Sequence, residues 1–212
     1  MIQSIAKKTA KIIVNNSEGK FSINVIAYSL EAILGELVKF TSFALVGMLF
    51  GCFIEMITVS IFYGIFRIAT GGPHCTSYMR CLVMGIVTFL VLAKISSYGT
   101  ETFLAIVVVV NILLTTFVTF RWVPGEWHQR KLKKTKKVYR NVAVLLLIVN
   151  FIIVVMIMIR SGDTWLKIGL AMQLGVLWQF INLTPLGYKL IGFTDQFMLN
   201  VIQSFCRKGE ML

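Results

Sequence analysis

Charged residues are scarce in this chain. Only 14% of its 212 residues are Asp, Glu, Lys or Arg, and 57% are hydrophobic. Soluble domains are near half apolar and a quarter charged, so both figures exclude an ordinary soluble domain. A helical crossing takes about 20 apolar residues, and the apolar stretches fit five or six such helices. The sequence therefore predicts one all-α, multi-pass membrane domain over residues 1–212.

Histidine is also scarce, and the cysteines follow no pattern. The chain has two histidines and four cysteines, with no spacing typical of a disulfide framework or a common zinc site. The paired histidines of a helical metalloprotease are absent. A metal site from His74, Cys75, Cys81 and His128 would need ligands from distant loops. We therefore expect no metal and no other cofactor.

Both ends of the chain are amphipathic, and no cleavable signal peptide is visible. Residues 1–20 set isoleucines against lysines, which predicts a helix lying on an anionic leaflet, with a frayed terminus as the alternative. Near the other end, Pro185 interrupts the last apolar run. The tail at 184–212 spaces Phe193 and Phe197 as one face of a surface helix.

A basic segment at 121–140 indicates the orientation of the chain. It separates two apolar runs and carries eight lysines and arginines against one acid, Glu126. Short basic loops stay in the cytoplasm. Two predicted spans separate this segment from residues 67–80, which are therefore expected in the cytoplasm as well. A nucleic-acid-binding patch is the alternative, and the position between two spans argues against it.

The first third of the chain can be divided in two ways. One places a span near 25–49, a turn, and a short span at 53–66. The other makes 21–38 an amphipathic surface helix, with Glu36 and Lys39 paired one turn apart. The sequence alone leaves both open.

The groups that could carry chemistry lie in the short segment 67–81. Cysteine proteolysis needs a thiolate and an imidazole that pairs with it, and His74 and Cys81 supply these groups. On one helix, residues seven apart stand about 10.5 Å apart along the axis, too far for that pairing. We therefore expect His74 on a loop, folded back over the start of the Cys81 helix by the glycines and proline at 71–73.

The predicted surroundings of Cys81 favour a thiolate. A helix N-terminus, Arg80 beside it and Arg67 would each lower the thiol pKa. Backbone N–H groups at the helix start could form an oxyanion hole. Cys75 is the competing nucleophile, but its side chain should point away from the adjacent His74. The remaining alternative is that these are ordinary loop residues.

The residue that would orient His74 is not evident. Ser77, Glu126 and Glu55 have suitable chemistry, and none stands out.

These residues resemble the accessory gene regulator protein B (AgrB) family. The resemblance covers roughly residues 1–190, and its specific part is the pattern formed by Arg67, Gly71, Gly72, His74 and Cys81. A following loop with a proline and a lysine run gives weaker support. The resemblance implies that His74 and Cys81 are a catalytic pair and that Arg67 and the two glycines are supporting positions.

Members of that family are membrane peptidases of Gram-positive quorum sensing. The resemblance implies that the enzyme cleaves an amphipathic AgrD-like propeptide on its C-terminal side and holds the rest as a Cys81 thioester. An internal cysteine or serine of the peptide then closes a thiolactone or lactone ring. A homodimer in the plasma membrane, with no nucleic-acid partner, is expected on the same basis. Five lysines could attract the acidic tail of the propeptide: Lys131, Lys133, Lys134, Lys136 and Lys137. Their alternative role is in topology alone.

Two features depart from the family pattern. Cys75 follows His74 where a small residue is more usual, and the tail beyond residue 190 is longer than in compact relatives.

A small transporter or membrane scaffold is the competing interpretation from another functional class. Coupled transport calls for polar groups near mid-membrane. The later spans contain Asn111, Gln173 and Gln179, with Lys94 and Lys167 as their only cations, and no acid at mid-depth. This is little for coupled transport.

Overall fold

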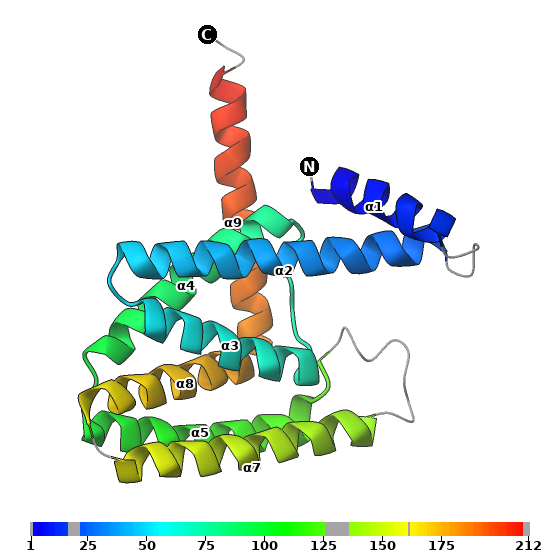
Figure 1. Ribbon diagram of the computed structural model, residues 1–212. Coiled ribbons are helices and arrows are strands. Elements are labelled where there is room, and N and C mark those ends of the chain that lie inside the picture. Colours follow the sequence, from blue (N-terminus) through cyan, green and yellow to red (C-terminus); the bar gives the residue numbers. More distant parts are fainter. Residues whose placement is uncertain (1, 17–21, 126–135, 161, 210–212) are drawn as a thin grey trace.

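The computed structural model describes residues 2–16, 22–125, 136–160 and 162–209. Within these ranges the chain is helical and contains no strand. The helices are shown in Figure 1 and run in the order α1 (Ile2–Asn16), α2 (Ile23–Leu49), α3 (Phe53–Thr70), α4 (Tyr78–Ser97), α5 (Glu101–Trp122), α7 (Lys136–Arg160), α8 (Asp163–Asn182) and α9 (Pro185–Gly209).

In the described part of the chain, five helices are long and apolar enough to cross a bilayer: α2, α3, α4, α5 and α7. The pair α8 and α9 is bent by 88° at a short break and counts as a sixth span if taken together. The prediction of an all-α, multi-pass membrane protein with five to six spans is confirmed.

The first third of the chain forms a helical hairpin. Helix α2 runs without interruption for 27 residues, so a surface helix ending at residue 38 is wrong. The turn falls at Gly51, whose φ of 65° lies in the left-handed region that glycine adopts without strain. Helix α3 has 18 residues, about 27 Å at 1.5 Å per residue, and is longer than the predicted short arm. The predicted pairing of Glu36 with Lys39 is present, at 2.6 Å.

Helix α8 is the centre of the bundle. It packs against α3, α4, α5 and α7, and Figure 1 shows it between α3 and the α5–α7 pair. Every residue from Gly169 to Val176 is buried. The approach to α3 is close, because a Cβ added at Gly175 would lie 2.6 Å from the carbonyl oxygen of Val59. Small residues permit such contacts between membrane helices.

Polar side chains inside the bundle join helices to one another. Asn111 on α5 donates from Nδ2 to the backbone oxygen and to Oε1 of Gln173 on α8, both at 2.8 Å. Lys167 is paired with Asp163 at 2.6 Å, at the beginning of α8. Asn111 and Gln173 therefore have a packing role, and they give the transporter interpretation no support.

Helix α1 lies against α2, as shown in Figure 1. It buries Ala6, Ala10 and Val14, while Ile5 and Ile12 stay exposed. The predicted N-terminal helix is therefore present, with a small-residue face on α2 and an isoleucine face left for lipid.

Helix α9 extends away from the bundle after the 88° bend, and it contacts α8 and α4 near its start (Figure 1). Phe193 is 72% exposed and Phe197 is also exposed, so the predicted aromatic face is unpartnered within the described chain. The opposite side of the same helix carries a buried acid, Asp195.

Candidate functional site

The loop between α3 and α4, residues 71–77, folds back over the end of α3. Gly71 and Gly72 have φ values of 74° and 131°, which only glycine adopts readily. The Arg67 guanidinium donates to the carbonyl oxygens of Gly71 (3.4 Å) and Pro73. A Cβ at Gly72 would collide with that guanidinium. Arg67 and the two glycines thus shape the loop, and the supporting role that the family resemblance implies for them stays a prediction.

Two further groups secure the same loop. Gln179 on α8 donates from Nε2 to the Thr70 hydroxyl and to the Gly71 carbonyl, both at 2.8 Å, and its side chain is fully buried. The Gly125 amide donates to the Thr70 carbonyl at 2.8 Å. The 71–77 loop (called the reactive loop below, after its predicted role) therefore lies beside the backbone that follows α5.

His74 lies on this loop, outside the helix that carries Cys81, as the spacing required. The pKa of His74 is lowered from its ordinary value to about 4, mainly because water is removed from around the imidazole and also because the cations Arg67 and Lys39 are near. Glu36 acts in the opposite direction. The imidazole is therefore neutral at neutral pH, the form that can accept a proton.

Cys81 lies in the first turn of α4, also as predicted. Its amide donates to the Ser77 carbonyl at 3.0 Å, the first bond of the helix. The three preceding amides, residues 78–80, have no acceptor in the described part of the chain. Free N–H groups at a helix start suit a developing negative charge.

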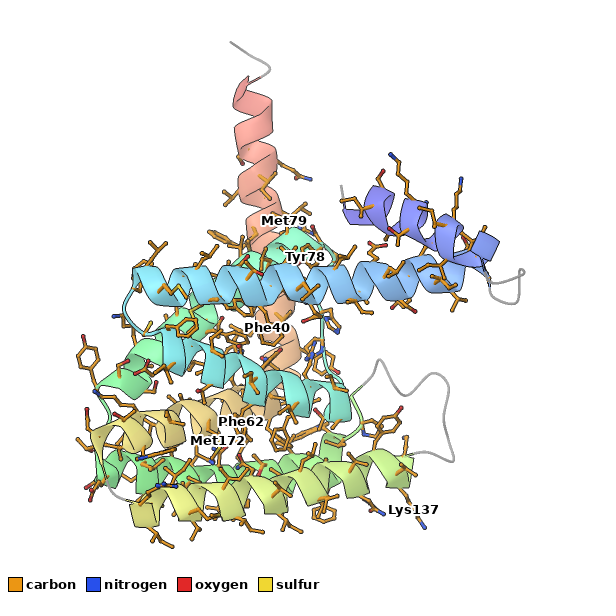
Figure 2. The ribbon with its side chains drawn as sticks, viewed as in Figure 1. Phe40, Phe62, Tyr78, Met79, Lys137 and Met172 are labelled. Carbon is orange, nitrogen blue, oxygen red and sulfur yellow. The ribbon has the colours of Figure 1, made fainter. Side chains whose placement is uncertain are left out.

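Helix α2 completes the site from a distant part of the sequence. The Tyr78 hydroxyl donates to the Gly35 carbonyl at 2.6 Å, and Figure 2 shows Tyr78 beside α2. One turn further along α2, the Lys39 ammonium interacts electrostatically with both His74 and Cys81. Lys39 is therefore near enough to act electrostatically on both residues. Among the described residues, no hydrogen bond joins the imidazole to the Cys81 thiol, and such pairs are often looser without substrate.

Cys75 faces a different set of neighbours from His74. Its thiol lies 3.9 Å from the Met84 sulfur. The pKa of Cys75 is raised to about 11, mainly by burial and also by Asp195 and by Cys81, whose side chain is hydrogen-bonded to that of Cys75. A thiol with that pKa is almost wholly protonated near pH 7 and is a poor nucleophile. This pKa makes Cys75 the poorer candidate, and the choice of Cys81 as nucleophile stays a prediction.

The predicted role of Arg80 needs correction. Arg80 is not a free cation beside Cys81, because its Nε donates to Asp195 Oδ1 at 2.6 Å. The cation that the structure brings to Cys81 is Lys39. The sequence missed this because residues 39 and 195 are far from residue 81 along the chain.

Comparison with known proteins decides the family. The model of the family "Accessory gene regulator B" matches residues 3–183. The chain belongs to the AgrB family. Membership in it implies a role in accessory-gene-regulator quorum sensing.

Three curated relatives named as AgrB-like cover most of the chain. One from Clostridium perfringens strain SM101 is 27% identical, over 82% of this chain and 86% of its own. A second, from Clostridium perfringens strain 13, is 25% identical, over 91% and 94%. One from Halalkalibacterium halodurans is 23% identical, over 87% of each. No solved structure matches the chain.

The predicted candidates for orienting His74 are placed as follows. Ser77 is the N-cap of α4, and its hydroxyl makes no capping bond. Glu55, in the first turn of α3, is 12 residues from Arg67, about 18 Å along the axis, and belongs to the opposite end of the bundle. Glu126 lies outside the described residues. The acid that the structure brings toward His74 is Glu36, which no local motif singled out.

The predicted basic contacts are only partly described. Lys131, Lys133 and Lys134 lie outside the described residues. Lys136 and Lys137 begin α7 and are exposed, and Figure 2 labels Lys137 at the outer edge of the bundle. His128 also lies outside the described residues, and within the described ones no three metal-binding side chains gather.

Proposed function

We propose that this AgrB-family protein is a membrane cysteine endopeptidase that matures a signal propeptide, with Cys81 as nucleophile and His74 as general acid and base. The observation that carries the proposal is the loop of His74, which Arg67 fixes at the end of α3 and which leads directly into the first turn of α4, where Cys81 lies. Three features support it: a neutral imidazole, free amides ahead of Cys81, and a neighbouring Cys75 held as a thiol.

The chemistry proceeds in two acyl transfers. The neutral His74 accepts the Cys81 proton, and the thiolate attacks the carbonyl carbon of the scissile peptide bond. The amides of residues 78–80 donate to the oxyanion. His74 then protonates the leaving amine, the C–N bond breaks, and the N-terminal part of the peptide remains as a Cys81 thioester.

The second transfer closes the ring. An internal thiol or hydroxyl of the bound peptide gives its proton to His74 and attacks the thioester carbon. The bond to Cys81 breaks, the thiolate is reprotonated, and a thiolactone or lactone is released. Exchange of one thioester for another is nearly neutral in energy. Exclusion of water would protect the intermediate from hydrolysis.

The substrate expected at this site is an amphipathic propeptide with an acidic tail. The chain has a net charge of +12, and its basic segment begins beside the reactive loop, where Gly125 contacts Thr70. Short basic loops are retained in the cytoplasm, which favours a cytoplasmic active site in the plasma membrane of a Gram-positive bacterium. A homodimer stays an expectation from the family.

The test is propeptide cleavage by the full chain in liposomes. We expect Cys81→Ala and His74→Ala to abolish cleavage, because each removes a group that changes bonds in the reaction. Cys75→Ala is the matched control and should remain active. Trapping of a peptide linked to Cys81, seen by mass spectrometry at low pH, would identify the thioester. If an inserted Cys81→Ala chain cleaved at the wild-type rate, the proposal would be wrong.

A further inference from the structure

A buried carboxylate reaches the reactive loop from outside the part of the chain that the family model matches. Asp195 is on α9, beyond residues 3–183, and is only 9% exposed. Its position on a predicted surface tail gave no reason to connect it with the site. The structure places it against the segment that joins His74 to Cys81.

The Asp195 carboxylate accepts hydrogen bonds from two residues of the His74–Cys81 segment, Thr76 and Arg80. Oδ2 accepts from the Thr76 amide at 3.2 Å and from the Thr76 hydroxyl at 2.7 Å. Oδ1 accepts from Arg80 Nε at 2.6 Å. Arg80 also donates to the Thr76 hydroxyl, so the three side chains form a closed set. Thr76 lies two residues after His74, and Arg80 immediately precedes Cys81.

The two charges of this set are shielded from water. The Arg80 and Asp195 side chains are 13% and 12% exposed. Removing one partner of such a pair leaves the other buried and uncompensated, which is far more costly than losing an exposed pair. Asp195 therefore joins Thr76, which lies just before α4, to Arg80 in the first turn of α4.

We propose that Asp195 is a positioning residue, through which α9 fixes the Thr76–Arg80 segment and hence the placement of Cys81 relative to His74. This inference rests on the proposed peptidase function for its kinetic consequences. Its structural part, the clamp from α9 onto the reactive loop, can be measured without substrate.

The kinetic test compares Asp195→Asn with Asp195→Glu in the full chain in liposomes. Asparagine preserves the shape but loses the charge, whereas glutamate retains the charge on a longer side chain. We expect kcat for propeptide cleavage to fall about tenfold to a hundredfold in Asp195→Asn, with KM changed far less, because misplacement of reacting groups acts on the chemical step. Asp195→Glu should retain more activity than Asp195→Asn. Gln196→Ala, at the exposed neighbouring position, is the matched control.

The double variant Arg80→Gln with Asp195→Asn gives a second measurement. If the pair acts as a unit, the double variant loses no more activity than the worse single variant. Additive losses, or higher activity in Asp195→Asn than in Asp195→Glu, would show that Asp195 acts only by filling space and would overturn the inference.

Alkylation of Cys75 supplies a readout that is independent of cleavage. Cys75 directly precedes Thr76, which Asp195 holds through two hydrogen bonds. Weakening this hold in Asp195→Asn should loosen the loop and speed alkylation of Cys75 at pH 8, as resolved by peptide mass mapping, whereas Asp195→Glu should speed it less. Cys52, 1% exposed, reports unfolding and should stay protected. An unchanged Cys75 rate would overturn the clamp. If Cys75 is alkylated faster in Asp195→Asn but the wild-type protein cleaves no propeptide, the clamp is retained and the peptidase proposal is rejected.

Discussion

The two ends of the helical bundle hold their polar groups in different ways. At the end with the reactive loop, buried side chains distant in sequence converge: Gln179 from α8, Asp195 from α9 and Arg67 from α3. At the other end, around a cavity of about 440 Å³ lined by Glu55 and Lys167, the ion pair is exposed and local. Lys94 at that end also reaches a distant group, the Phe50 carbonyl, but this contact is exposed as well. The two ends thus differ in the burial of their polar contacts.

This difference indicates what each end must do. Exposed pairs within one helix contribute little, because water screens them and two side chains must be ordered. Buried hydrogen-bonded groups such as Gln179 Nε2 and the Asp195 carboxylate fix geometry, because a buried donor or acceptor that loses its partner is costly. The reactive end therefore has the properties of a preorganised site, and the opposite end those of ordinary helix connections.

The largest loss of activity is expected from Gly72→Ala, at the end of the bundle that carries the reactive loop. The added Cβ would demand a strained φ of 131° and would collide with the Arg67 guanidinium. We expect cleavage to fall by about a hundredfold, since small displacements of reacting groups have effects of that size. The measurement is kcat/KM for propeptide cleavage in liposomes.

Gly51→Ala is the control for this variant at the opposite end. Gly51 also has a positive φ, 65°, but a Cβ there would meet nothing within 4 Å. It should lower thermal stability slightly and leave cleavage near wild type. Equal losses in both variants would mean that backbone strain anywhere in the bundle, and not the loop itself, limits activity.

A smaller effect is expected from Gln179→Leu. The substitution removes the hydrogen bonds to the Thr70 hydroxyl and to the Gly71 carbonyl, and leaves that carbonyl with one donor fewer. A buried polar group without its partner costs about 1–3 kcal/mol, so we expect a lower thermal midpoint and about tenfold slower cleavage. Asp163→Asn, in the exposed pair with Lys167, should change neither quantity measurably. A Gln179→Leu chain with wild-type cleavage would contradict the anchoring role.

The smallest effect is a change in pH dependence from Lys39→Met. The pKa of His74 is about 4, with burial as the main cause and with Arg67 and Lys39 adding to the decrease, so the neutral base should persist down to about pH 5. Removing the Lys39 charge raises the pKa of His74, and the remaining Glu36 acts in the same direction. Activity should therefore be lost at a higher pH as the solution is acidified.

The measurement is the cleavage rate between pH 4 and pH 8, compared with Lys94→Met at the opposite end, where Lys94 donates to the Phe50 carbonyl at 2.6 Å. The control should keep the wild-type acid limb. If Lys39→Met lost activity at the same pH as the wild type, or at a lower pH, Lys39 would not act on His74.

Much of the site could be predicted because its rules are local. The distance argument required His74 to leave the Cys81 helix, and α4 does begin at Tyr78, after the His74 loop. Glycines 71 and 72 take the positive φ values that their residue type suggested. The predicted freedom of Arg80 failed because its partner, Asp195, is 115 residues away along the chain.

In the first third of the chain, too, local sequence rules left a choice that only the packing of the helices resolved. Two divisions were compatible with its residues, because Glu36 and Lys39 can pair on a surface helix or on a span. Packing decided between them. Helix α2 continues past residue 38 because its Phe43 and Gly47 are buried in the core. That contact depends on a surface contributed by other helices.

The sequence by itself determined the membrane class, the helical architecture, the approximate spans and the residues able to perform cysteine chemistry. These follow from the bilayer's need for long apolar helices and from the chemistry of single side chains. Only the tertiary structure brought Lys39, Glu36, Gln179 and Asp195 to the reactive loop. Such contacts depend on how helices pack, and packing joins residues that no local spacing connects.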